Sequence, residues 1–529
     1  MPDSKVEYTT TEYTVEEGPR VEYTTTTTTT TVEEKTAVVD EKSEKHDYLD
    51  TSASSNDVTE EFDARGERIY TKSDAEKKLV RKLDYLYVMP FIAILNFLQF
   101  FDKSALNYAG VLGIQEDTGT TLGQFSWLGS LFYLGYLVYQ APNQFLLQRM
   151  PLAKYTGALI VLWGLVLAVT FEAKNFPQLA GLRFLLGFFE AAMYPCCIML
   201  ISTMYRRREQ AARLGVVYIC NGVAMAVGGF IGYGIGHMDG ALGHKSWQWL
   251  MIILGAITIF FGIVIFFCLV DNPRSRFLRL TPEQLQIVDE RQRDNTTVVT
   301  KEIKWSHVIE SLKEPRYYCF CVASMLINFQ NGALNTFSSI ITKGFGFSGV
   351  DAILLTVPSG VVDIIYIVLI LWYNNKYGNT LYCACAMLVF AIIGLILLIA
   401  IPVPKAKLLG LYLCWAYAAA YVMFLSSVAN NVNGYTKKIF YSSSIIVFYT
   451  IGNFAGPLMM VSWQAPLYLG GMIAYIASNF ICIFMFWFAR MSMAKINKER
   501  LARGITQVPV GEEMKDMTDR ENPNFIYRL

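Results

Sequence analysis

Histidine and charged residues are scarce in this sequence. Histidine accounts for only 4 of 529 residues, and Asp, Glu, Lys and Arg together make up 17%. A net charge of +1 argues against a nucleic-acid partner, because such proteins concentrate basic residues on one face. The four histidines fall in expected tails, loops or helix ends: His46, His237, His244 and His307. Proton transfer inside the membrane therefore has to rely on other side chains.

The cysteine pattern predicts neither disulfides nor a metal site. All 10 cysteines lie in apolar stretches, where cysteine behaves as a small hydrophobic residue. The pairs Cys319/Cys321 and Cys383/Cys385 are two positions apart on expected helices, so their side chains diverge. We expect no metal and no cofactor. Because no histidine, cysteine or serine cluster is placed for catalysis, we also expect no enzyme.

Apolar residues dominate what remains. Hydrophobic residues make up 53% of the chain and aromatic residues 14%, more than one soluble core could bury, so the solvent must include a lipid bilayer. Residues 1–82 are the exception: they are rich in Thr, Glu, Lys and Ser, and we expect a disordered tail. This tail lacks the apolar core of a secretory signal, so the first span is expected to direct the chain to the membrane.

Twelve apolar segments are each long enough to cross a bilayer. Six precede a polar stretch and six follow it: Leu86–Tyr108, Leu122–Leu146, Tyr155–Phe171, Leu179–Met204, Leu214–Ile235, Trp249–Val270, Tyr317–Ile341, Ala352–Tyr373, Leu381–Ile401, Leu408–Val428, Ile439–Val461 and Leu467–Phe488. Six spans, a linker and six more are typical of a duplicated transporter. The predicted fold is an all-α membrane protein of two six-helix bundles, 83–270 and 317–490, with a linker 271–316 and a tail 491–529.

Basic residues predict the orientation of these spans. They are enriched in the even-numbered connections, and short basic loops stay in the cytoplasm. We therefore expect both tails and the linker to be cytoplasmic. The basic residues concerned are Arg149, Lys154, Arg206, Arg207, Arg208, Arg213, Lys376, Lys437 and Lys438.

Five charged residues lie inside expected spans: Asp102, Lys103, Arg183, Glu190 and Asp363. A charge near the bilayer centre costs about 3 kcal/mol, so each suggests a function. Arg183 and Glu190 share one helix face, since two helical turns separate them. In one interpretation, Asp102/Lys103 and Arg183/Glu190 are ion pairs that only hold helices together. In the other, Asp102 and Glu190 carry protons, and protonating one of them frees Lys103 or Arg183 for an incoming anion.

Weaker candidates complete the expected site. Asp363 is predicted to make a polar contact beside a helix break at Pro358, with proton coupling as the alternative. Tyr136, Asn331 and Asn453 are candidate substrate ligands, although intramembrane amides often bridge helices instead. Tyr133 could also line the cavity, although such aromatic residues are often only packing. The other intramembrane amides could bind a ligand or bridge helices: Asn221, Asn328, Gln330, Asn335 and Asn430.

Several segments in order resemble one known family, the fungal allantoate permease group of the anion:cation symporters, within the major facilitator superfamily. The resemblance covers nearly the whole chain from about Tyr85. It rests on Phe101–Tyr108 (FDKSALNY), Arg183–Glu190 (RFLLGFFE) with Pro195, Tyr205–Arg213 with Glu209, Trp247–Trp249 (WQW), Asp271–Pro273 (DNP), Asn433–Lys438 (NGYTKK), Gly452–Pro457 (GNFAGP), Ala465–Pro466 and Asp516–Phe525 (DMTDRENPNF).

This resemblance implies proton-driven uptake, at the plasma membrane, of a small organic anion such as allantoate, ureidosuccinate, a small peptide or a vitamin-like acid. The expected partners are that anion, protons and the lipid bilayer, and the carrier is expected to be monomeric. It also implies proton coupling at Asp102 and Glu190 and anion handling at Arg183. Two positions depart from the pattern: Lys103 replaces a frequent arginine, and Gln148 replaces an aspartate.

Three other functions fit the sequence less well. A drug:proton antiporter usually has a Gly-Pro pair in its fifth span, and Asn221–Gly236 contains no proline. A nutrient sensor usually needs a folded cytoplasmic extension, whereas the sequence of both tails predicts disorder. A membrane enzyme would need a cluster of catalytic residues, and this sequence shows none. The importer remains the preferred hypothesis.

Overall fold

A computed structural model describes residues 61–62, 68–69, 73–147, 149–295, 304–504 and 517–529. Two short strands, β1 (Glu61–Phe62) and β2 (Arg68–Ile69), pair antiparallel within the N-terminal unit. Helix α1 (Asp74–Lys82) begins at the capping residue Ser73, so the last part of the expected tail is helical. The disorder predicted for residues 1–60 and the departure at Gln148 lie outside the described residues.

The first half of the helical unit contains six spans, as predicted. They are formed by α2 (Met89–Val111), α4 (Leu122–Leu147), α5 (Leu152–Val169), α6 (Phe176–Glu190) with α7 (Met193–Met204), α8 (Arg207–Gly236) and α9 (Ser246–Cys268). Short elements lie between them: a π-helix at Leu83–Tyr87, α3 (Ile114–Thr118) and 3-10 turns at Thr170–Glu172, Ala241–Gly243 and Arg276–Leu278.

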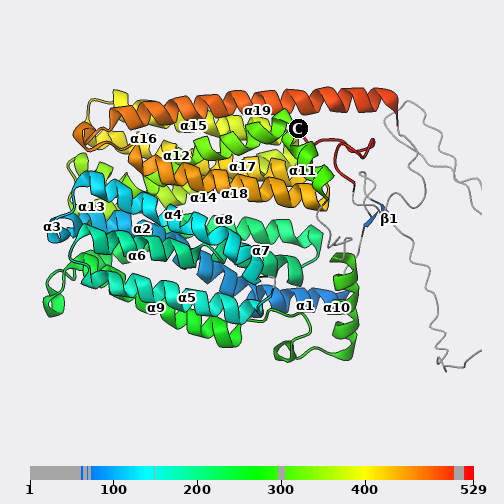
Figure 1. The fold of residues 1–529 in the computed structure, drawn as a ribbon, viewed down its shortest axis with the longest axis horizontal. Coiled ribbons are helices and arrows are strands. Elements are labelled where there is room, and N and C mark those ends of the chain that lie inside the picture. The colour runs from blue at the N-terminus through cyan, green and yellow to red at the C-terminus, as the bar shows by residue number, and fades with distance from the viewer. Residues whose placement is uncertain (1–60, 63–67, 70–72, 148, 296–303, 505–516) are drawn as a thin grey trace, which may run out of the picture. The chain divides into compact units, whose positions relative to one another are not determined.

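The second half repeats this plan. Its spans are α12 (Pro315–Gly344), α13 (Gly349–Leu354) with α14 (Thr356–Tyr377), α15 (Thr380–Ala400), α16 (Leu408–Cys414) with α17 (Ala416–Asn431), α18 (Tyr435–Leu458) and α19 (Leu469–Arg503). Further 3-10 turns lie at Pro404–Lys407 and Ser462–Gln464. Two linker helices, α10 (Pro282–Asn295) and α11 (Trp305–Leu312), lie between the halves in sequence, and Figure 1 shows all these helices as one elongated bundle.

Two of the twelve spans are more polar than the rest. Among the described residues, 10 helical segments are long and apolar enough to cross a membrane, and α4 and α12 are not among them. Both bury polar side chains against protein, including Ser130 on α4 and Asn328 on α12. These two helices can be polar because much of their surface packs against the other half, α4 against α18 and α12 against α2.

Prolines explain two broken spans. The fourth span was expected to be continuous, but it breaks between α6 and α7, because Pro195 has no N–H to donate to the carbonyl of Ala191. The break expected at Pro358 lies at Leu355, one turn earlier, for the same reason: Pro358 cannot bond Leu354. The fourth-span break directly follows Glu190, so it lies beside a predicted site residue.

The helical unit has two distinguishable ends. We call the end with α1, α10, α11 and residues 517–529 the linker side, and the end with α3 and α13 the far side (Figure 1). Near the far side the halves are joined: Asn107 of α2 donates to Ser338 of α12 at 2.8 Å, and Ser130 of α4 donates to the carbonyl of Phe454 of α18 at 2.6 Å. Tyr108 of α2 also bonds Thr356 of α14 at 3.2 Å. The protein is therefore closed on its far side.

Candidate functional site

Four charged side chains meet between α2 and α6 in the first half, and Asp102, Arg183 and Glu190 are buried. Lys103 Nζ lies 3.1 Å from Glu190 Oε1, so this ion pair joins the two helices. Asp102 accepts a hydrogen bond of 2.6 Å from the indole N–H of Trp163 on α5. Asp102 and Glu190 are both 0% exposed. The pairing differs from the expected Asp102/Lys103 and Arg183/Glu190 pairs, because neighbouring residues on α2 point to different partners.

Arg183 is a buried charge with an unused hydrogen-bond donor. Its side chain is buried on the same face of α6 as Glu190, and it interacts electrostatically with Asp102 without a direct ion pair. Its Nη2 atom has no hydrogen-bond partner among the described residues. A buried guanidinium with an unused donor is suited to binding a carboxylate. The anion loses its hydration in the site, and charge-assisted hydrogen bonds from the guanidinium offset that cost.

Close packing of α4 against α6 sets the position of this face. A Cβ atom on Gly187 would lie 1.8 Å from the carbonyl oxygen of Phe132, and one on Gly135 would lie 2.0 Å from that of Phe184. The backbones of α4 and α6 therefore touch at the glycines of the two helices. This contact places Tyr133 and Tyr136 of α4 beside the charged face of α6, and both tyrosines are buried.

In the second half, asparagines form one connected network. Asn331 of α12 donates to Asn453 of α18 at 2.8 Å and accepts from Tyr417 of α17 at 2.6 Å. Asn335 donates to Asn331 at 2.7 Å, and Asn328 accepts from both Asn331 and Asn453. Both predicted ligands thus lie together, but Asn453 is fully buried and holds α18 to α12, which is the helix-bridging role.

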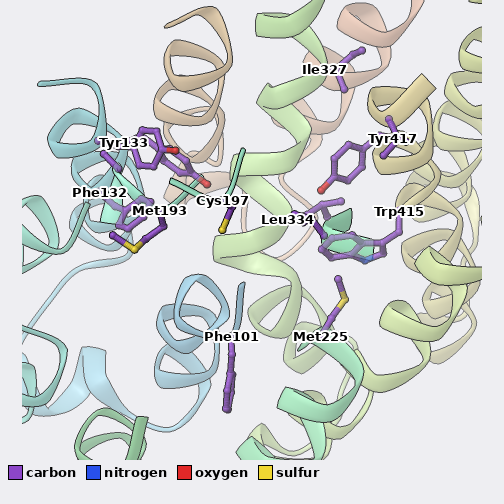
Figure 2. Close-up of a cluster of buried hydrophobic side chains, with 14 of the residues drawn as sticks. Phe101, Phe132, Tyr133, Met193, Cys197, Met225, Ile327, Leu334, Trp415 and Tyr417 are labelled. Atoms are coloured by element: carbon purple, nitrogen blue, oxygen red, sulfur yellow. The ribbon is translucent and has the colours of Figure 1, made fainter. Parts of the chain in front are cut away.

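Buried hydrophobic side chains of both halves belong to one cluster. Figure 2 shows Phe101, Phe132 and Tyr133 of the first half and Leu334, Trp415 and Tyr417 of the second half within one buried cluster. Tyr449 of α18 interacts electrostatically with Lys103, so it connects the second half to the charged site. Lys103, Asn331 and Tyr449 are only partly buried. These three side chains are therefore more exposed than Asp102, Arg183, Glu190 and Asn453.

Further half-buried tyrosines lie toward the linker side. Tyr194 of α7 donates a short hydrogen bond to Tyr218 of α8, and Tyr421 of α17 interacts electrostatically with Tyr194. All three are partly exposed. These partly exposed tyrosines thus lie on the linker side of the charged site.

Sequence reasoning missed Trp163 and Tyr417. Trp163 lies in an apolar span, and nothing in its neighbourhood indicates that its N–H serves Asp102 from another helix. Tyr417 is one of many aromatic residues in its span. Such partners depend on helix rotation and crossing angles, which hydropathy does not encode.

Each linker helix is anchored to its own half by ion pairs. Arg291 of α10 lies 2.6 Å from Glu76 of α1 and 2.5 Å from Glu209 of α8. Glu310 of α11 lies 2.7 Å from Lys437 of α18. These contacts place α10 on the first half and α11 on the second.

The C-terminal residues are folded, contrary to the expectation of a disordered tail. Asp519 lies 2.7 Å from Arg316 and 2.8 Å from Lys437, and Asn497 and the backbone of Tyr527 exchange two hydrogen bonds. Burial acts to raise the pKa of Asp519, but Arg316 and Lys437 outweigh it and lower the pKa to about 2. Residues 517–529 are thus part of the second half.

Fold and site together define a class: a duplicated, twelve-span helical membrane carrier with a charged site in one half and an amide site in the other. The chain belongs to the Major Facilitator Superfamily, whose family model matches residues 92–457. It is therefore a transporter and not an enzyme.

Curated relatives are similar over most of their length. The chain is 32% identical to the allantoate permease of Saccharomyces cerevisiae, covering 86% of this chain and 87% of the relative. It is 29% identical to the thiamine pathway transporter of the same yeast, covering 91% and 92%. An uncharacterised transporter of Schizosaccharomyces pombe is 32% identical, covering 90% and 92%. These matches fit a fungal transporter group that includes the allantoate permease.

Solved structures confirm the fold. A bacterial homologue of the human lysosomal transporter Spinster, inward-facing and occupied, has a TM-score of 0.61 at 14% identity and covers 80% of this chain and 99% of its own. A D-xylose–proton symporter has a TM-score of 0.54 at 14% identity, covering 76% and 96%. At this identity the likeness extends to the fold alone.

Proposed function

We propose that this protein is a proton-coupled importer of a small organic carboxylate, such as allantoate, ureidosuccinate, a dipeptide or a vitamin-like acid. The observation that supports this proposal most strongly is Arg183, a buried guanidinium with an unused donor beside the buried acid Asp102. Similarity to an allantoate permease and a thiamine pathway transporter supports a small-molecule substrate of this kind.

Charge balance gives the coupling mechanism. Two buried acids, Asp102 and Glu190, face two cations, the buried Arg183 and the partly buried Lys103, so the empty site is neutral. An added anion would leave one buried charge uncompensated, which is costly in a low-dielectric site. Protonation of Glu190 neutralises its carboxylate and frees Lys103 for the anion. Proton and carboxylate then bind with mutual assistance, and the loaded site is neutral again.

The remaining side chains orient the substrate. Its carboxylate binds Arg183 and Lys103, while its uncharged polar groups meet Tyr136, Asn331 and Tyr449. Asn453 acts indirectly, because its Oδ1 accepts a hydrogen bond of 2.8 Å from Asn331 Nδ2 and so holds Asn331 in place. A neutral, occupied site allows the two halves to rock, so that the far side opens while the linker side closes.

The basic loops indicate the orientation, and the resemblance to the allantoate permease group implies the location. Both termini and the linker side face the cytoplasm, and the plasma membrane is the site of action. The far-side-closed conformation described above is then the inward-facing state.

Uptake in a yeast that lacks its own allantoate-type permeases tests this function. Labelled allantoate, a dipeptide, nicotinate, pantothenate and thiamine would be offered at pH 5 and pH 7.5, with and without a protonophore. We expect uptake of an acid that is faster at pH 5, collapses with the protonophore and is lost in Glu190→Gln.

The matched control is Glu172→Gln, because Glu172 is an exposed acid in the loop between α5 and α6. It should transport like the wild type, whereas Arg183→Gln should lose the acid substrate. Uptake that is independent of pH would refute proton coupling. Efflux of a preloaded compound in exchange for protons, without uptake of any acid, would favour an exporter.

A further inference from the structure

A lone buried acid lies in the half that the proposed mechanism does not use. Asp363 of α14 is 3% exposed, and its Oδ1 atom has no hydrogen-bond partner among the described residues. It is also the one charged residue in the spans of the second half, over 317–342, 352–375, 380–400, 408–431, 439–458 and 469–489. Asp363 therefore has no countercharge within its own half.

The carboxyl group lies at a contact between the two halves. A Cβ atom on Gly222 of α8 would lie 3.3 Å from Asp363 Oδ2 and 3.0 Å from the carbonyl oxygen of Gly360 on α14. A Cβ atom on Gly360 would lie 2.5 Å from the carbonyl oxygen of Gly222. Glycine at both positions lets the α8 and α14 backbones touch, and this contact encloses Asp363.

No charged group from the surrounding helices compensates it. On α8, the described charged side chains lie in the first two turns, up to Arg213. From α17, Tyr417 faces Asp363 and interacts with it electrostatically. Helices α15 and α16 carry only neutral titratable groups, Tyr382, Cys383, Cys385, Tyr412 and Cys414, and α8 adds Tyr218, Cys220 and Tyr233. On α13, Asp351 is exposed at the far side.

An ionised carboxylate in such a site loses its hydration without gaining a partner, so the neutral acid is the form that the enclosed site accepts. Separation of α8 and α14 would hydrate the group and allow it to ionise. We propose that Asp363 is a second proton-binding site, protonated while the halves are closed on the far side and released to far-side water when α8 and α14 part.

This site has a direct mechanical consequence. Because the closed state binds the proton more tightly, acidification favours closure of the far side, and the ratio of closed to open molecules changes by at most about tenfold per pH unit. A more acidic solution on the far side thus drives the protein toward the state that is open to the linker side. The inference does not depend on which substrate is carried, and its test needs none.

The test is a distance measurement by pulsed electron spin resonance in lipid nanodiscs between pH 5 and pH 8. Nitroxide labels would be attached through unnatural amino acids at Lys174 and Lys405, exposed far-side loop residues of the first and second half, so that all native cysteines remain. In the wild type we expect the short far-side distance at pH 5 and a growing long-distance population toward pH 8.

Variants separate this site from the first one. Asp363→Asn should keep the short distance at every pH, Asp363→Glu should keep a pH response, and Asp351→Asn should behave as the wild type. Glu190→Gln, which removes the proposed first proton site, should leave a pH response that disappears when Asp363→Asn is added. A wild-type distance independent of pH, or a full pH response in Asp363→Asn, would overturn the proposal.

Discussion

Replacement of Gly187 by alanine is the sharpest test of how α4 positions the charged face of α6. The added Cβ would lie 1.8 Å from the carbonyl oxygen of Phe132. A close C···O contact is about 3.3 Å, so the two helices would have to separate by about 1.5 Å. Both atoms belong to helix backbones, so neither can rotate away. Overpacking of this kind costs about 3 kcal/mol, the upper part of its usual range.

The matched control lies on the same helix. A Cβ on Gly181 would meet nothing within 4 Å, so Gly181→Ala should be neutral or stabilise the protein by about 0.5–1 kcal/mol through helix propensity. Gly187→Ala should lower the unfolding temperature by about 3 °C for a chain of this length. It should also reduce uptake, because a displaced α6 carries Arg183 and Glu190 with it.

A thiol-reactive fluorophore provides the assay. Cys196 and Cys197 on α7 are each 3% exposed and become reactive only as the bundle opens. Equal unfolding temperatures for Gly187→Ala and the wild type would refute the packing argument, and so would an equal loss in Gly181→Ala.

Three further predictions concern the linker side and the far side. Lys437→Met should destabilise the protein by about 3–5 kcal/mol in the same assay, since it leaves Glu310 and Asp519 without their lysine; exposed Lys438→Met should have a far smaller effect. The depressed pKa of Asp519, about 2, means that its stabilising charge is complete above about pH 4 and is lost only as the pH falls toward 2. Hydrogen exchange of residues 517–529, corrected for the intrinsic rate, should therefore be equal at pH 5 and pH 7.5. Asn107→Ala removes two hydrogen bonds between the halves, to the Ser338 hydroxyl and from the Ser339 N–H, which together contribute about 1–3 kcal/mol, and should enlarge the long-distance population between far-side labels.

Much of the architecture could be predicted from hydropathy and charge. Apolar runs of bilayer length gave twelve spans, and the intramembrane charges marked α2 and α6 before their positions were known. The polar character of α4 and α12 did not hide them, because each still has a long apolar-rich stretch. Such features are local in sequence, so composition within one window is enough to find them.

Other features depend on contacts between distant segments. Lys103 pairs with Glu190 rather than with its neighbour Asp102, and Asp102 finds Trp163, because successive residues on a helix point about 100° apart. The break after Glu190 did have a local signal in Pro195. The folded C-terminal residues had none, since their order comes from Arg316 and Lys437, far away in sequence.

Proton coupling through the ion pair of Lys103 and Glu190 is the central claim, and purified protein in liposomes tests it most directly. A labelled acid that the protein carries would be followed in two modes, accumulation driven by an imposed pH gradient and exchange against unlabelled acid at equal pH. Glu190→Gln mimics the protonated acid, so we predict loss of gradient-driven accumulation with exchange retained. Accumulation in Glu190→Gln equal to that of the wild type would contradict the account.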